Sequence, residues 1–279
     1  MSATKSKRLG SLAIVDLPKV LHFGATFVAA ARLRIMWKWK WSIIGEAVAN
    51  PMFYLLSIGI GIGKFVGSRH VAGIDGVSYL TFLAPALLAS ACIIGAVNAV
   101  MHPTLEGFKW NKNFFAMNAT PLSATQISDG VLIAAVARAL FGTVIYYLAL
   151  VAFGGVSNLR SLWLLPMTLF SATAFASLML GVCAAVKNPD LLLNIVNRLL
   201  IMPLFLFSGT FYSLKTMPYF LQVIGWFSPL WHATEVGRWI AYGHSMTTTV
   251  LAIHLAYMAV MLIAGINLSR YFFGKRLAE

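Results

Sequence analysis

The sequence is poor in charged residues: Asp, Glu, Lys and Arg make up only 10% of its 279 residues, and only eight residues are acidic. A soluble domain carries about 25% charged residues. With 59% hydrophobic residues and a mean hydropathy of +0.81, this composition excludes an ordinary soluble protein. The two cysteines, Cys92 and Cys183, lie in apolar runs and supply neither a disulfide framework nor metal-ligand spacing. The sequence therefore predicts an all-α integral membrane protein.

A phosphate-binding loop is also missing, although one stretch resembles it. The segment NPMFYLLSIGIGIGKFVGS, residues 50–68, places alternating glycines before Lys64. A P-loop needs a glycine, four residues and then Gly-Lys-Ser/Thr. Counted from Lys64, the first glycine position holds Ile58 and the hydroxyl position holds Phe65. The dinucleotide pattern fails at its third glycine as well, so we predict that this chain binds no nucleotide cofactor here.

Six apolar segments have the length of about 20 residues that a transmembrane helix needs. They are Ser42–Gly63, Leu80–Met101, Gln126–Val151, Leu162–Val186, Leu193–Tyr212 and Thr247–Tyr271. Six spans place both termini on the same side. The side that carries the termini also carries most of the Lys and Arg, which is the cytoplasmic pattern. We therefore predict a multi-pass protein with both termini in the cytoplasm.

The net charge of +13 could indicate nucleic-acid binding, but its distribution argues against that function. Eight of the 21 Lys and Arg precede the first apolar run, and three lie at the C-terminal end of the last. Basic residues that flank membrane spans meet anionic lipid. Membrane lipids, and not nucleic acid, are therefore the predicted partners of this charge.

The segment before the first span differs in character from the spans. Within residues 1–41, the tryptophans Trp37, Trp39 and Trp41 alternate with lysines. Tryptophan beside lysine suits the headgroup layer of a membrane. This pattern favours an amphipathic interfacial helix on the cytoplasmic face, and a lysine-rich anchor without a defined helix is the alternative. Residues 272–279 form the expected cytoplasmic tail.

Two connecting segments are long and aromatic. The cytoplasmic loop 102–124 mixes aromatic residues with charge, and the outer segment 213–246 is interrupted by Pro218 and Pro229. The outer segment is too irregular for a span and too apolar for a solvated loop. Backbone at membrane depth must satisfy its own hydrogen bonds, so we expect short re-entrant or interfacial helices there.

Four stretches occur in order along the chain: NPMFYLLSIGIGIG, YLTFLAPALL, FKWNKNFFAMNATPLSATQISDG and PLFLFSGTFYSLKTMPYFLQVIGWFSPLWHATEVGR. Together they resemble the permease subunit of type-2 ABC exporters (ABC-2 type), particularly the nodulation lipooligosaccharide exporter and daunorubicin-resistance permeases. The resemblance covers about residues 30–270. It rests on order and spacing, because none of the four stretches is catalytic.

This resemblance implies a six-span permease domain, residues 42–271, preceded by the interfacial helix, in a bacterial plasma (inner) membrane. It implies that loop 102–124 supplies a coupling helix that sits in a groove of a separate ATPase. It further implies two ATPase subunits that bind ATP and Mg²⁺, and a second permease, identical or paralogous. The chain itself would be a transport subunit and not an enzyme.

Candidate coupling residues combine aromatic anchors with charges that fix the register of an interface. They are Glu106, Phe108, Lys109, Trp110, Asn111 and Asn113. The alternative is a helix on the lipid surface with solvated charges.

Candidates for the substrate path or the dimer interface are more scattered. Ionisable groups inside spans are costly and often functional, which applies to Glu46 and to the deeper Arg138, although pairing or snorkelling would also explain them. A polar stripe at the inner end of span five either joins helices or lines the inner mouth of the path. The full set is Glu46, Gly59, Gly63, Arg138, Asn194, Asn197, Arg198, Phe211 and Tyr212.

Gly59 and Gly63 are four residues apart, a spacing that lets two helices approach closely in lipid. Glu235 and Arg238 are three apart and are interpreted as a structural pair. The six histidines show no ligand spacing, so no metal site is predicted.

The leading functional interpretation is an exporter permease for an amphipathic glycolipid, lipid-linked saccharide or polysaccharide, with a hydrophobic drug as the alternative substrate. A membrane-embedded lipid-modifying transferase is the alternative of another class. It would need clustered acids or histidines, whereas Glu46, Asp129 and Glu235 are scattered along the chain.

Overall fold

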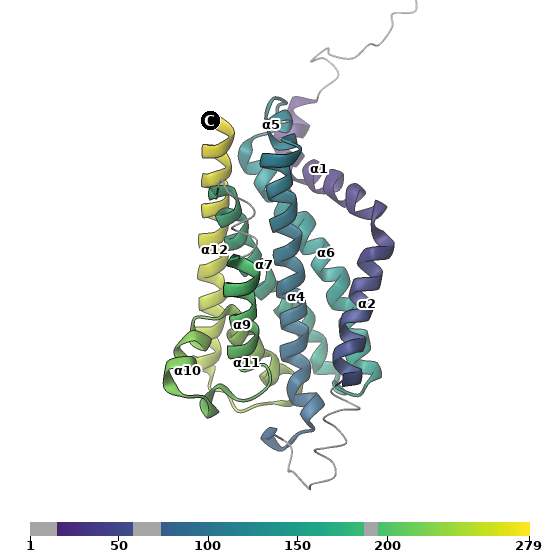
Figure 1. Cartoon of the computed structure of the whole chain (residues 1–279), viewed down its shortest axis with the longest axis vertical. Coiled ribbons are helices and arrows are strands. Elements are labelled where there is room, and N and C mark those ends of the chain that lie inside the picture. Colours follow the sequence, from purple (N-terminus) through teal and green to yellow (C-terminus); the bar gives the residue numbers. More distant parts are fainter. Residues whose placement is uncertain (1–15, 58–73, 187–194) are drawn as a thin grey trace, which may run out of the picture.

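A computed structural model describes residues 16–57, 74–186 and 195–279, and within these ranges the chain forms helices and no strand. Long helices stand side by side in a bundle, and α5 and the C-terminus lie at the end opposite α10 (Figure 1). The α-helices are α1 Leu17–Lys38, α2 Lys40–Leu56, α4 Tyr79–Leu105, α5 Asn113–Asn118, α6 Ala124–Ala152, α7 Leu164–Ala185, α9 Met202–Phe207, α10 Tyr219–Trp226, α11 Pro229–Tyr242 and α12 Thr248–Ala278. Shorter turns are η3 Ile74–Gly76, η4 Glu106–Trp110, η5 Leu159–Trp163, η6 Val196–Ile201 and η7 Leu214–Thr216.

Four helical stretches in the described ranges are long and apolar enough to cross a membrane: Tyr79–Trp110, Ala124–Ala152, Leu159–Ala185 and Thr248–Ala278. They match predicted spans two, three, four and six. The described part of span one is α2, and that of span five is η6 with α9. An all-helical fold with several apolar helices compatible with a membrane protein is therefore confirmed for the described residues, while the count of six spans stays a prediction.

Helix α4 lies at the centre of the bundle, where it packs against α6, α7 and α11. Most of its residues from Phe82 to Met101 are buried. A helix that is hydrophobic on all sides is stable only inside a protein or a membrane. Both cysteines are free and buried, Cys92 on α4 and Cys183 on α7.

Two helices continue beyond their predicted ends. The loop expected from residue 102 is helical at first, because α4 runs to Leu105 and its last turn widens into the π-helical η4. The tail expected from residue 272 is also helical, because α12 runs to Ala278. Burial explains both differences. Leu105 and Phe108, where α4 passes into η4, belong to the same hydrophobic core as Phe273 and Leu277 in the last turns of α12.

Helix α1 packs along α6 and then bends into α2 at Trp39. The side chains of Trp37, Trp39 and Trp41 are exposed. The Lys40 ammonium lies 5.0 Å from the Trp37 ring centroid and 5.5 Å from that of Trp41. The segment is thus helical over Leu17–Lys38, and its position on the membrane surface stays a prediction.

The outer segment 213–246 contains η7, α10 and α11, with Pro218 before α10 and Pro229 as the first residue of α11. Proline suits the first helical turn because it lacks a backbone N–H that would be unpaired there. The prolines therefore delimit short helices, as the sequence indicates, and whether these helices are re-entrant stays a prediction.

Helices α7 and α12 approach closely at Gly265. A Cβ at this position would overlap the Ser177 hydroxyl and come within 2.5 Å of the Leu178 backbone nitrogen. Apolar side chains gain little from each other in lipid, so small residues that permit close contact hold such helices together.

We predict that Gly265→Ala lowers the thermal unfolding midpoint of the purified protein, because overpacking costs about 1–3 kcal/mol. Gly274 on the same helix is the matched control, since a Cβ there meets nothing within 4 Å. Gly274→Ala should leave the midpoint unchanged or raise it, because alanine favours helix by about 1 kcal/mol. Equal midpoints for the two variants would contradict this account of the α7–α12 contact.

Candidate functional site

The predicted coupling residues lie on a compact segment, residues 106–118, that connects the end of α4 to α6. It consists of η4, a left-handed residue at Lys112 and the short helix α5. Figure 1 shows α5 at the end of the bundle that also carries the C-terminus of α12. We call this the 106–118 segment.

Three phenylalanine rings fix the 106–118 segment to α12. The Phe108 centroid lies 5.0 Å from that of Phe114 and 4.9 Å from that of Phe273, and Phe114 lies 5.3 Å from Phe273. All three side chains are buried. Gly107 is required here, because any Cβ would overlap the Phe114 ring. Aromatic contacts at these distances stabilise packing beyond the area they bury.

Arg276 of α12 joins the same cluster to α7. Its guanidinium carbon lies 4.4 Å from the Phe108 centroid, within cation–π range. Its Nη1 donates to the carbonyl oxygens of Ala184 at 2.9 Å and Val186 at 3.1 Å, at the C-terminus of α7. A cation at this position satisfies carbonyls that the helix end leaves unpaired.

Arg32 of α1 contacts the segment from the other side. Its guanidinium lies 5.0 Å from the Phe114 centroid and 3.8 Å from the Glu106 carboxylate, and Nη2 donates to the Pro103 carbonyl at 3.4 Å. Burial lowers the pKa of Arg32, and the Glu106 charge acts in the opposite direction. An arginine remains charged despite such a shift, so α1 is held to the segment by a buried cation.

The predicted coupling residues differ in exposure, and Glu106 and Asn113 are half-buried. Phe108 is buried and packs against Phe273, so in this structure it anchors the segment to its own chain, while its part in coupling stays a prediction. Lys109, Trp110 and Asn111 are exposed. Glu106 accepts a hydrogen bond from the Asn111 side chain at 2.5 Å.

Several residues of this site were missed in the sequence. Phe115 is exposed, and its ring centroid lies 6.1 Å from that of Phe108, while Arg32, Phe273 and Arg276 contact the buried rings of the segment. The doubled phenylalanine in KNFFAM was a visible signal for Phe115. The two arginines gave none, because their partners lie far away along the chain.

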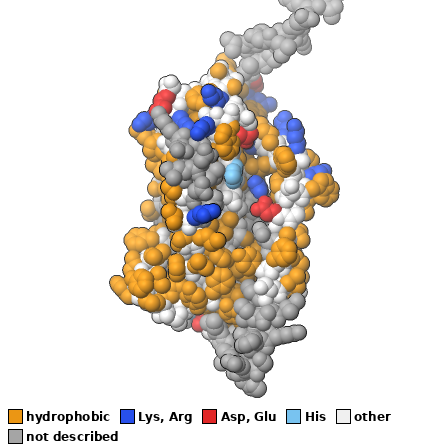
Figure 2. Space-filling model, viewed as in Figure 1, with side chains coloured by type: hydrophobic (Ala, Val, Ile, Leu, Met, Phe, Trp, Pro, Cys, Tyr) orange, Lys and Arg blue, Asp and Glu red, His pale blue; other side chains and the backbone are white. Residues whose placement is uncertain are grey.

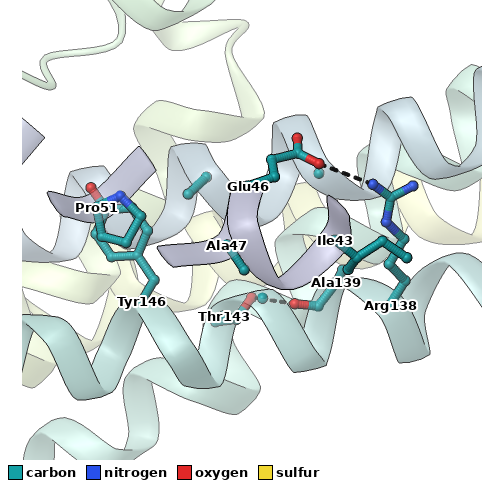
Figure 3. Close-up of a pocket in the computed structure, with 11 residues that line it drawn as sticks. Ile43, Glu46, Ala47, Pro51, Arg138, Ala139, Thr143 and Tyr146 are labelled. Carbon is teal, nitrogen blue, oxygen red and sulfur yellow. Dashed lines mark hydrogen bonds and ion pairs between the residues drawn. The ribbon is translucent and has the colours of Figure 1, made fainter. Parts of the chain in front are cut away.

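A second candidate site brings Glu46 and Arg138 together. Arg138 Nη2 lies 3.2 Å from Glu46 Oε2, and both side chains line a cleft of about 70 Å³ between α2, α4 and α6 (Figure 3). Asp129 pairs with a different arginine, because its carboxylate accepts two hydrogen bonds from Arg270, at 2.9 and 2.7 Å. Charged residues inside a span usually pair with one another. The interpretation of Glu46 and Arg138 as paired residues is therefore confirmed, and each is the partner of the other.

The remaining path candidates that the structure describes lie on different segments. Gly59, Gly63 and Asn194 lie outside the described residues, and Asn197 and Arg198 belong to η6, where Arg198 is exposed. Phe211 and Tyr212 lie near the opposite end from the 106–118 segment. The Phe211 carbonyl accepts a hydrogen bond from Tyr79 at 3.3 Å, and the Tyr212 hydroxyl donates to Leu206 at 3.4 Å.

The predicted pair of Glu235 and Arg238 is confirmed. Arg238 Nη1 lies 2.9 Å from Glu235 Oε1, and its Nη2 donates to the Gly209 carbonyl at 2.7 Å. The Arg238 side chain is only 2% exposed, and its guanidinium carbon lies 3.8 Å from the Phe82 centroid. It therefore joins α11, α4 and the turn that follows α9.

A family model described as ABC-2 type transporter matches residues 25–242. Nodulation protein J of Rhizobium leguminosarum bv. viciae is 28% identical over 237 residues, 85% of this chain and 88% of that protein. Inner membrane transport permease YadH of Escherichia coli strain K12 is 26% identical over 200 residues, 71% of this chain and 74% of that protein.

We predict that Arg138→Glu lowers the unfolding midpoint, because the new carboxylate lies opposite that of Glu46 across the α2–α6 contact and the two repel each other. The swapped double variant, Glu46→Arg with Arg138→Glu, should recover about half of the loss or more, since the ion pair re-forms in reverse. Thermal unfolding in detergent measures both effects.

Arg270 provides the control, because its partner is Asp129. The effects of Glu46→Gln and Arg270→Gln should add, as expected for sites without a shared partner. A swapped variant no more stable than Arg138→Glu alone would contradict the pairing.

Proposed function

This chain belongs to the ABC-2 type transporter family as the permease component of an ABC transporter, and we propose that it exports an amphipathic glycolipid, lipid-linked saccharide or polysaccharide. The family associates with ABC ATPase subunits. The finer proposal is that the 106–118 segment receives the force of ATP-driven closure and passes it to the spans.

The observation that carries this proposal is the two-sided construction of the segment. The segment exposes Lys109, Trp110 and Phe115, cationic and aromatic side chains of the kind that form interface anchors. Its inward side is fixed to α12 by Phe108 and to α1 by Arg32. A partner that displaces the outward side would therefore move the ends of the helices as well.

Transport would follow from a shift between inward- and outward-facing states. A partner can shift that equilibrium only as far as its affinity differs between the two states. The segment supplies such a difference if the ATPases contact it differently when closed. We propose two ATPase subunits that hold ATP and Mg²⁺, and a second permease, identical or paralogous.

Three observations support the substrate class and the location. The quoted sequence stretches resemble nodulation lipooligosaccharide exporter permeases, and relatives carry the names Nodulation protein J and inner membrane transport permease. On the face in Figure 2, Lys and Arg gather at the end that carries α5 and the C-terminus. Positive charge favours the cytoplasmic side, so we place both termini there, in the inner membrane of a bacterium.

The path for the substrate is part of the same proposal. We place its inner mouth at the polar residues Asn194, Asn197 and Arg198, and its outer end near Phe211 and Tyr212. A close contact between permeases through Gly59 and Gly63 would complete it.

A lipid-modifying transferase is disfavoured by the pairing of the acids. Glu46, Asp129 and Glu235 each accept hydrogen bonds from an arginine, and the three lie on different helices. A general acid or base must be positioned beside reacting atoms with a suitable pKa, and carboxylates engaged with arginine are poor candidates.

We predict that Trp110→Ala, and independently Phe115→Ala, weakens the complex with the ATPase subunits while the permease stays folded. Loss of an interface anchor costs about 2 kcal/mol, or about 30-fold in affinity. ATP turnover in proteoliposomes should fall with the loss of association, and co-purification measures that association directly.

The exposed Trp163, at the start of α7 and far from the segment, is the matched control. Trp163→Ala should leave ATP turnover unchanged. Phe108→Ala should behave differently from both, because emptying the buried cluster costs about 3–5 kcal/mol of stability. Normal assembly and turnover in Trp110→Ala and Phe115→Ala would refute the proposed coupling role.

A further inference from the structure

A cavity of about 590 Å³ opens at the end of the bundle opposite α5. Its walls come from η3, η7, α10, α11 and the beginning of α12. It has the size of a small-molecule pocket, and such pockets combine aromatic walls with a few polar groups. Here the aromatic walls are Trp226 and Trp231, and the polar groups include Glu235 and Arg238.

Two buried donors on residues that line this cavity have no acceptor in the described part of the chain. The first is Nε of Arg238, whose side chain is 2% exposed and whose Nη atoms donate to Glu235 and to the Gly209 carbonyl. The second is the buried Nε1 of Trp231. A buried donor without a partner costs free energy that a ligand oxygen would recover.

Acceptors lie in the same cavity. The Glu235 carboxylate faces Arg238 and the His244 ring, whose Nε2 is 3.7 Å from Glu235 Oε2 and whose Nδ1 is 3.1 Å from Asp75 Oδ2. Gln222 donates to the Met217 carbonyl at 2.8 Å, which leaves its side-chain oxygen able to accept. Donors and acceptors are therefore mixed.

The charges in the cavity balance. Asp75 and Glu235 oppose Lys215 and Arg238, so neither an anion nor a cation is selected by net charge. In the described ranges no group of three or more His, Cys, Asp or Glu is placed to hold a metal. A ligand that both donates and accepts hydrogen bonds, carries no charge and has an apolar face matches this lining best.

We infer that the cavity binds an uncharged saccharide, with hydroxyl groups on Glu235 and the free donors of Arg238 and Trp231. An aromatic face such as Trp226 packs against the C–H face of the sugar ring. The inference rests on the proposed export of a saccharide-bearing substrate, and it names the site where the sugar is held at the outer end. The sugar belongs either to a lipid-linked substrate or to a free oligosaccharide.

The test is equilibrium binding to the full chain, with its ATPase subunits, in nanodiscs without nucleotide. The probes are the hexyl glycosides of glucose, maltose and N-acetylglucosamine, used as monomers, with free maltose and hexyl phosphocholine beside them. At least one glycoside should bind, and hexyl phosphocholine should not compete. Binding by the glycoside alone indicates a lipid-linked ligand, whereas equal binding by free maltose indicates a free saccharide.

Trp231→Phe, which removes one donor and keeps an aromatic ring, should weaken glycoside binding by about three- to tenfold. Glu235→Gln should weaken it by about tenfold or more, since hydrogen bonds to charged groups are stronger. The control is Trp239→Phe on the same helix, a tryptophan that lines a different, apolar cavity. Unfolding midpoints report whether each variant remains folded.

The inference is overturned if no glycoside binds, if hexyl phosphocholine competes equally, or if folded Trp231→Phe and Trp239→Phe bind alike. Because no ATP turnover is involved, failure here leaves ATP-driven export of another substrate intact. Failure of the Trp110 and Phe115 variants to affect the ATPase would instead refute coupling, with saccharide binding unaffected.

Discussion

The contact among Phe108, Phe114 and Phe273 is the constraint on which the proposed mechanism depends. It joins a segment that follows α4 to the last turns of α12, although about 160 residues of chain separate them. Arg276 extends this contact to the end of α7, and Arg32 extends it to α1. Close-packed interiors transmit displacement because they resist compression. A displacement of the segment therefore also displaces three further helices, α12, α7 and α1.

Toward the other end of the bundle, buried arginine replaces aromatic packing as the connecting element. Arg238 contacts α4 through Phe82 and the turn after α9 through the Gly209 carbonyl, while it pairs with Glu235 on its own helix. A buried charge is tolerated only with such partners. The two ends of α4 are thus tied to different neighbours, at Phe82 through Arg238 and at Pro103 through Arg32. A motion that changes the contacts at one end of α4 can therefore change the contacts at its other end.

The sequence predicted the parts that depend on composition along the chain. Apolar runs predicted four of the long helices, and Pro218 and Pro229 predicted the short outer ones. Helix ends were less accessible: residues 102–110 look polar enough for a loop, yet Leu105 and Phe108 are buried against residues of α12 that no local pattern connects to them. The Glu46–Arg138 and Asp129–Arg270 pairs span 92 and 141 residues. Which acid meets which arginine depends on how the helices pack, and the sequence left that choice open.

The most direct test of the central claim is a distance measurement on the 106–118 segment. Spin labels at Lys112→Cys and Lys275→Cys measure the distance between the segment and α12. Labels at Lys112→Cys and Leu159→Cys measure the distance between the segment and the opposite end of the bundle. The native cysteines are buried. Labelled chain is diluted with unlabelled chain in the complex with the ATPase. On ATP binding, the 112–275 distance should stay constant while the 112–159 distance changes. The account would be contradicted if the 112–275 distance changed on ATP binding and this local movement of the segment alone explained the change in the 112–159 distance.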